Sequence, residues 1–164
     1  MKKSTILLLV VVYIMSFFII GLLGNSVRSY NPVYEPESIE LVEPDEKTTL
    51  ANEDGPLTDP DGNVWDYWFV YHGYTAGSVV RIKANVKPDN STYPYVTFVK
   101  DAENTSFNME THETDSNIEE NLALFSLNTE LSKTRPAVTA KFTIVSQNPG
   151  VPITINACIV FSIY

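Results

Sequence analysis

The sequence predicts an all-β fold, an antiparallel β-sandwich of about seven strands, preceded by one transmembrane helix. Three observations carry this prediction. An uninterrupted apolar run covers residues 5–24. After it, several short segments alternate between apolar and polar residues and are separated by turn residues. No segment after the run has the apolar periodicity of an amphipathic helix. Short strands with one apolar face each are typical of two antiparallel sheets packed face to face.

The apolar run Thr5–Gly24 contains no charged residue and no proline. In a helix, its length corresponds to about 30 Å, the thickness of the hydrocarbon core of a bilayer. Lys2 and Lys3 precede it, and all 20 acidic residues follow it. Short flanks rich in lysine stay in the cytoplasm. We therefore expect residues 1–4 inside the cell and the chain from residue 25 outside, behind a signal-anchor.

The alternative is a cleaved signal peptide that would release the rest of the chain as a secreted protein. Gly24 and Ser26 give a small-x-small pattern before Val27, which leaves cleavage open. The apolar part of a signal peptide is usually about 7–15 residues long, and this run is longer. On length we favour the uncleaved anchor in a single-pass membrane protein.

Residues 25–62 read as an acidic, proline-rich linker. Five of the ten prolines fall here, among many acidic residues. Such a segment buries too little apolar surface to fold by itself and tends to be extended. Within this linker, apolar and polar residues alternate over Ser38–Val42. This stretch could be a first strand of the domain or simply part of the linker, and the sequence leaves both interpretations open.

The charge of the chain disfavours two classes of partner. The formal net charge is −9, and the part after the run, with nine of the 11 basic residues, carries −11. This balance disfavours binding to nucleic acid or to an anionic membrane surface.

The single cysteine, Cys158, rules out an intrachain disulfide and a cysteine-based zinc site. It lies on the more polar face of the last predicted strand, where it could join two chains by a disulfide in an oxidising compartment. The alternative is a small buried apolar residue.

Residues 63–164 are predicted to form the domain outside the membrane. The clearest alternation covers residues 78–87, which indicates a strand with one buried and one solvent-exposed face. Asp59–Asn63 is a turn signal that also resembles the start of a calcium loop, without the later ligand positions. We expect strands over residues 64–72, 78–87, 93–100, 106–110, 121–128, 137–147 and 152–164.

One part of this domain resembles the immunoglobulin-like domains of bacterial surface proteins. Ile82–Pro88 matches an apolar-x-Ala-x-Val-x-Pro strand end, Asn90–Thr92 the turn after it, and Val96–Phe98 the next strand. Ser91 stands for the usual alanine and Phe98 for the usual tryptophan, while Ile153–Ala157 is similar to the final strand of that family. The resemblance covers at most the outer domain. It implies an immunoglobulin-like sandwich at a cell surface, in adhesion, spacing or recognition, and it transfers no catalytic residues.

Two clusters are candidates for binding. The aromatic segment 64–71 could present an exposed platform for a sugar, or it could be core packing. Its candidate ligand residues are Trp65, Tyr67, Trp68 and Tyr71. The second cluster could hold a divalent cation, but we favour a hydrated acidic loop and predict no metal site. Its ligand-type residues are Glu110, His112, Glu113 and Asp115.

No catalytic or nucleotide-binding motif occurs, so we expect neither an enzyme nor a bound cofactor. We expect a structural or interaction module tethered to the outer face of the membrane, with a protein or cell-wall glycan as partner. The alternative is a glycan or cell-wall-polymer binding module that uses the aromatic segment 64–71. We also expect residues from about Asp59 onward to fold without the anchor and linker, unless Ile39–Val42 completes a sheet.

Overall fold

A computed structural model describes residues 32–42, 44, 48–51, 55–72, 79–103 and 105–163. The predicted transmembrane run at 5–24 lies outside these ranges. Within them, no helix has the length and apolar character needed to cross a membrane. Tyr34–Tyr164 is a compact all-β unit, and eleven strands are assigned among its described residues. The predicted all-β sandwich is confirmed as two main sheets packed on each other, but the unit has eleven described strands in place of about seven, and one strand pair is parallel where all were expected to be antiparallel.

One sheet has four strands in the order β1-β6-β9-β8, and every neighbouring pair is antiparallel. Val80, Ile82 and Ala84 are fully buried, whereas Arg81 and Lys83 between them are exposed. This is the alternation predicted for residues 78–87. The strands are β1 (Ser38–Val42), β6 (Val79–Lys87), β9 (Leu122–Leu127) and β8 (Phe107–Thr111).

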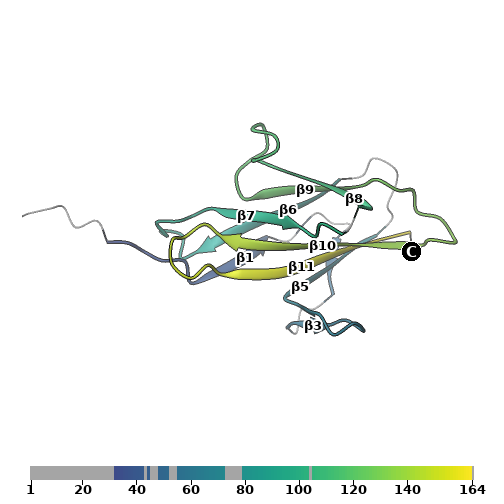
Figure 1. The fold of residues 1–164 in the computed structure, drawn as a ribbon, viewed down its shortest axis with the longest axis horizontal. Coiled ribbons are helices and arrows are strands. Elements are labelled where there is room, and N and C mark those ends of the chain that lie inside the picture. The colour runs from purple at the N-terminus through teal and green to yellow at the C-terminus, as the bar shows by residue number, and fades with distance from the viewer. Residues whose placement is uncertain are drawn as a thin grey trace, which may run out of the picture. The chain divides into compact units, whose positions relative to one another are not determined.

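The other sheet has five strands in the order β2-β5-β11-β10-β7, and Figure 1 shows β5, β11, β10 and β7 of this sheet side by side. The pair β5–β11 is parallel and the other pairs are antiparallel. The long β10–β11 pair runs from Ala137 opposite Ser162 to Val145 opposite Thr154. The strands are β2 (Thr48–Leu50), β5 (Tyr67–His72), β11 (Thr154–Ser162), β10 (Ala137–Ser146) and β7 (Val96–Lys100).

The core lies between the two sheets and contains a row of phenylalanine rings. Phe125 of β9 and Phe142 of β10 meet across the sheets with their ring centroids 4.5 Å apart. Phe107 extends the row in the first sheet and Phe98 extends it in the second. All four side chains are at most 7% exposed. Inward-facing residues of both sheets thus interdigitate as in a β-sandwich.

The compact unit includes much of the predicted linker. The stretch Ser38–Val42, which the sequence left open, is strand β1 and pairs with β6 over five residues. Ile39 on it is only 4% exposed and joins the core. β2 then pairs with β5 at the edge of the other sheet. The compact unit therefore includes residues from Tyr34 onward, whereas the sequence predicted a domain that starts at residue 63.

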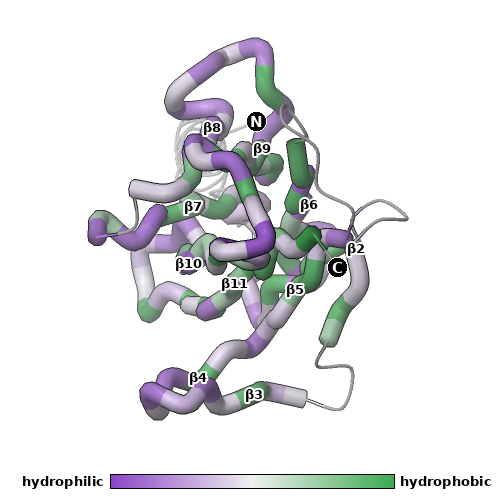
Figure 2. The backbone as a smooth tube through the Cα atoms, turned by 90° about the vertical axis from the view of Figure 1, so that its right-hand side faces the viewer, coloured by the Kyte–Doolittle hydropathy of each residue, from purple (hydrophilic) through white to green (hydrophobic). Residues whose placement is uncertain are grey.

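The predicted strand over residues 64–72 divides at Asp66. The amide of Asp66 donates to the carbonyl of Asn156 at 2.9 Å, and its Oδ2 accepts from the amide of Asn156 at 2.8 Å. The bend leaves β4 (Val64–Trp65) to pair with β3 (Leu57–Thr58) in a separate hairpin. This hairpin projects from the sheets, and in Figure 2 its turn is hydrophilic while the strands of the sandwich are more apolar.

Candidate functional site

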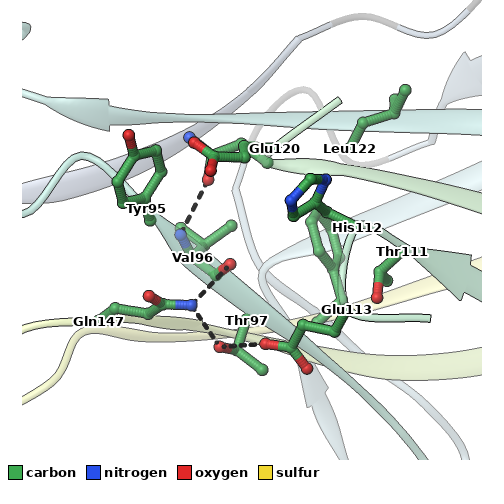
Figure 3. A pocket seen from close by; sticks show the side chains of 11 residues that line it. Tyr95, Val96, Thr97, Thr111, His112, Glu113, Glu120, Leu122 and Gln147 are labelled. Atoms are coloured by element: carbon green, nitrogen blue, oxygen red, sulfur yellow. Dashed lines mark hydrogen bonds between the residues drawn. The ribbon is translucent and has the colours of Figure 1, made fainter. Parts of the chain in front are cut away.

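The described residues form a pocket of about 180 Å³ where the outer strand β7 meets the loop between β8 and β9. Val96 and Phe98 of β7 contribute to its lining. Polar side chains surround it, as Figure 3 shows, and they are Tyr95, His112, Glu113, Glu120 and Gln147. We call it the acidic pocket, because its lining contains two carboxylates and neither lysine nor arginine.

Asn121 attaches the loop to β7 at one side of the acidic pocket. Its Oδ1 accepts from the amide of Val96 at 2.9 Å, and its Nδ2 donates to the carbonyl of Pro94 at 2.7 Å. Its backbone has a φ of 61°, in the left-handed region that asparagine tolerates better than most residues. This conformation ends the loop and starts β9 at Leu122.

A chain of hydrogen bonds closes the other side of the acidic pocket. Nε2 of Gln147 donates to Oγ1 of Thr97 at 2.9 Å, and Oγ1 of Thr97 donates to Oε1 of Glu113 at 3.3 Å (Figure 3). Gln147 follows β10, Thr97 lies in β7 and Glu113 belongs to the loop after β8. The chain therefore connects the open edges of the two sheets.

The loop between β8 and β9 has its own internal hydrogen bonds. Nδ1 of His112 donates to the carbonyl of Ile118 at 2.7 Å, since a carbonyl can only accept. The carboxylate of Asp115 accepts from the backbone amide and the side-chain amide of Asn117, and these bonds lower the pKa of Asp115. The loop thus keeps one shape beside β7.

Tyr95 and Glu120 form a pair at the mouth of the acidic pocket. A hydrogen bond to Glu120, reinforced by its negative charge, raises the pKa of the Tyr95 hydroxyl. The ring of Tyr95 remains 45% exposed, so an apolar surface lies next to the two carboxylates. This arrangement suits a ligand with a positive charge and an apolar part.

A second structured region is the turn of the β3–β4 hairpin, built around Asp59. Its Oδ1 accepts from the amides of Asp61 and Asn63 at 3.0 and 2.8 Å. Its Oδ2 accepts from the side-chain amide of Asn63 at 2.9 Å and from Nε1 of Trp65 at 3.1 Å. These bonds, that from the side chain of Asn63 above all, lower the pKa of Asp59 to about 2. The predicted hairpin turn is confirmed.

Lys141 connects this hairpin to the outer face of the five-stranded sheet. Its Nζ lies 5.4 Å from the ring centroid of Trp65 and 3.9 Å from Oδ2 of Asp59. Beside it is a second pocket of about 250 Å³, which Trp65, Thr143 and Asn156 also line. We call it the hairpin pocket. It combines an aromatic ring with hydroxyl, amide and ammonium groups.

The four residues of the predicted aromatic platform do not form one exposed surface. The inward face of β5 carries Phe69 and Tyr71, which are 2% and 3% exposed, and Tyr67 packs against the same core. Trp68 alternates with them and is half-buried. Trp65 lies in the hairpin beyond the bend at Asp66 and is 7% exposed. The four side chains do not share one face because the bend at Asp66 interrupts the strand.

Cys158 lies on the outer face of β11 as predicted, but it is fully buried. Its cross-strand neighbours are Lys141 of β10 and Trp68 of β5, so the three side chains lie on the same face of the sheet. Burial raises the pKa of the thiol to about 12. In this arrangement its sulfur is covered, which disfavours the predicted interchain disulfide.

The ligand-type residues of the second predicted cluster are dispersed. His112 and Glu113 line the acidic pocket, whereas Asp115 bonds to Asn117 and Glu110 lies on β8. Among the residues that the structure describes, no group of three or more His, Cys, Asp or Glu side chains is placed to hold a metal ion.

Sequence reasoning missed Tyr95, Glu120, Asn121 and Gln147 as site residues. They come from three connecting segments that only the fold brings together. The acidic loop with Glu110, His112, Glu113 and Asp115 was predicted from the sequence, but no local signal indicates that it packs against β7.

Comparison of the chain with protein-family models, with curated proteins and with solved structures found no match.

Proposed function

We propose that this chain is a single-pass membrane protein that displays an immunoglobulin-like sandwich outside the cell as an interaction module. The order of the strands in the two sheets supports the immunoglobulin-like fold in this proposal. In such domains strands A, B, E and D form one sheet, and C, F and G form the other. The orders β1-β6-β9-β8 and β7-β10-β11 match these two sets, with β5 and then β2 added beyond β11. This match supports the resemblance found in the sequence.

The proposed location depends on the N-terminal sequence. The apolar run Thr5–Gly24 is long enough to span a bilayer, and Lys2 and Lys3 favour a cytoplasmic N-terminus. The acidic remainder of the chain would then lie on the extracytoplasmic side. Release by signal cleavage would give the same domain in secreted form.

The acidic pocket supports a binding role, as opposed to catalysis. Its polar groups bond to one another or to the backbone, as Thr97 does with Glu113 and His112 with Ile118. Its volume is below the roughly 300 Å³ at which small-molecule sites usually begin. A pocket of this size at the rim of two sheets suits one side chain of a protein partner. We propose no enzymatic activity and no cofactor.

The hairpin pocket favours a second candidate, a module that binds glycan or cell-wall polymer. Trp65, Thr143 and Asn156 offer an aromatic ring, a hydroxyl and an amide, and sugars are bound by such combinations of stacking and hydrogen bonds. Glycan-array binding that is lost in Trp65→Ala and retained in Tyr71→Phe would support it. Tyr71 serves as the control because it faces the core.

The interaction role is tested on intact cells that carry the full-length chain. External protease should remove the chain after about Val27 and spare the N-terminus. A membrane-impermeant crosslinker should join the outer domain to another protein in a specific band. A domain protected from external protease, or crosslinking no different from that of cells lacking the chain, would contradict the proposal.

A further inference from the structure

Among the described residues β7 is an edge strand, and its free edge carries backbone groups that do not bond to β10. The amide of Gln147 bonds to the carbonyl of Tyr95, and the amide of Asp101 bonds to the carbonyl of Lys141. In an antiparallel ladder, every second residue of a strand bonds to the same neighbour. The register with β10 therefore turns the backbone groups of Val96, Phe98 and Lys100 outward. The bond from the Val96 amide to the side chain of Asn121 agrees with this direction.

Beyond Val96, the described residues leave this edge without the usual protection against strand pairing, whereas at Val96 itself the side chains of Asn121 and Gln147 bond to the backbone amide and carbonyl. Exposed edges are commonly blocked by an outward lysine, by proline or by a bulge. Lys100 is turned inward: its Nζ donates to the carbonyl of Phe107 and lies 4.5 Å from the ring centroid of Phe107. Val99 of β7 and Tyr95, which directly precedes the strand, are 48% and 45% exposed, so apolar surface beside this edge is in contact with water.

The acidic pocket lies along the same edge. Val96 and Phe98 line it, while Glu113 and Glu120 supply two carboxylates with no lysine or arginine in the lining. A basic side chain is the complementary group, because its charge meets the carboxylates and its aliphatic stem can lie against apolar residues. The pocket volume of about 180 Å³ corresponds to roughly six water molecules, which suits one side chain.

We propose that the free edge of β7 and the acidic pocket together bind an extended segment of a partner protein that carries a lysine or arginine. The segment pairs with the backbone of Phe98 and Lys100 as an added strand. Its basic side chain enters the acidic pocket beside Glu113 and Glu120. This inference rests on the proposed interaction function and gives the chemistry of the partner.

The probe is a blocked heptapeptide of alternating threonine and valine with one central lysine. It is labelled and titrated, by fluorescence anisotropy, into the full-length chain purified in mild detergent. Three further peptides are controls. One has norleucine in place of lysine, and the other two carry N-methyl groups on the backbone amides of one edge or of the opposite edge. A peptide that binds as an added strand pairs through one edge only.

Two double variants of the chain test the side-chain contact. Glu113→Gln with Glu120→Gln removes the charges of the acidic pocket, and Glu37→Gln with Glu130→Gln removes two exposed charges outside its lining. We expect about tenfold weaker binding of the lysine peptide to the first variant and a change within about twofold for the second. Circular dichroism melting curves check that both variants remain folded.

The expected pattern has three parts: the lysine peptide binds, norleucine weakens binding about tenfold, and only one of the two N-methyl sets abolishes binding. Absence of binding by the lysine peptide would overturn the inference. Equal binding of the norleucine peptide, tolerance of both N-methyl sets, or unchanged binding to the variant lacking Glu113 and Glu120 would do the same. In each of these cases, crosslinking on cells can still succeed, which separates this failure from failure of the proposed function.

Discussion

The backbone amide of Val96 donates a hydrogen bond of 2.9 Å to Oδ1 of Asn121, a residue 25 positions further along the chain. This contact joins the outer strand of one sheet to the loop that leads into the other sheet. Together with the bond from Asn121 to the carbonyl of Pro94, it positions the acidic pocket. The shape of the pocket therefore depends on one asparagine in a left-handed conformation.

Replacement of Asn121 should separate the contribution of its side-chain hydrogen bonds from that of its left-handed backbone conformation. Asn121→Gly removes the two side-chain hydrogen bonds and should lower the free energy of unfolding by about 1–3 kcal/mol. Asn121→Ala should cost about 1–2 kcal/mol more, because alanine is strained at a positive φ. Urea unfolding of the domain measures both values. Equal stability of the two variants would show that the left-handed backbone does not persist in solution.

Asp59 should make the hairpin sensitive to acid. Its folded-state pKa of about 2 is below the ordinary value of 3.8, so it contributes stability that is complete above pH 3.8 and is lost as the pH falls through 2. We expect the tryptophan fluorescence of the native chain to shift over this interval. Asp59→Ala should show the shift already at neutral pH, because Trp65 loses its acceptor. Asp61→Ala, which removes an exposed carboxylate of the same turn, is the control and should leave the spectrum unchanged.

Cys158 should be unreactive in the folded domain. Its pKa of about 12 exceeds the ordinary value of 9, so the neutral thiol stabilises the fold fully below pH 9, and this contribution is lost between pH 9 and 12. Because the thiolate is the reactive form and the side chain is buried, a maleimide should label native protein about a hundredfold more slowly than urea-unfolded protein. Trp65→Ala should accelerate labelling if the hairpin covers the sulfur. Rapid labelling of native protein, or a dimer on a non-reducing gel, would contradict the buried position.

The start of the folded domain can be tested with two fragments. A fragment beginning at Tyr34 should unfold cooperatively with an all-β circular dichroism spectrum, because it keeps every described strand. One beginning at Asp59 loses β1, β2 and β3, together with the buried side chain of Ile39. We expect the shorter fragment to melt at a lower temperature and to aggregate through the exposed edge of β6. Equal melting temperatures of the two fragments would instead support the domain boundary near residue 63 that the sequence predicted.

The strands of the sandwich were predictable where alternation was regular. Ile82, Phe142 and Ile159 each lie in such a segment and each is buried, because a period of two gives a strand one apolar face to bury. The bend at Asp66 was not predictable, since it depends on hydrogen bonds to Asn156, a residue 90 positions away. The aromatic segment around Trp65 does form strands, but the bend places Trp65 in β4 and the other aromatic residues in β5.

The acidic pocket was less predictable than the fold. His112 and Glu113 were recognised as candidate ligands, but their partners come from other segments. Gln147 reaches Thr97 across 50 positions, and this contact exists only because β7 and β10 are neighbours. Local patterns in one sequence determine strands and turns, whereas the pairing of distant loops follows from the order of strands in the sheets.

NMR measurement of amide hydrogen exchange in the Tyr34–Tyr164 fragment, with and without the lysine peptide, tests the central claim most directly. In the free domain, the account predicts slow exchange for Thr97 and Val99, which face β10, and fast exchange for Phe98 and Lys100, which face outward. Saturation with the peptide should slow the exchange of Phe98 and Lys100. Slow exchange of both amides in the free monomer, or fast exchange that persists at saturation, would contradict a β7 edge that binds an added strand.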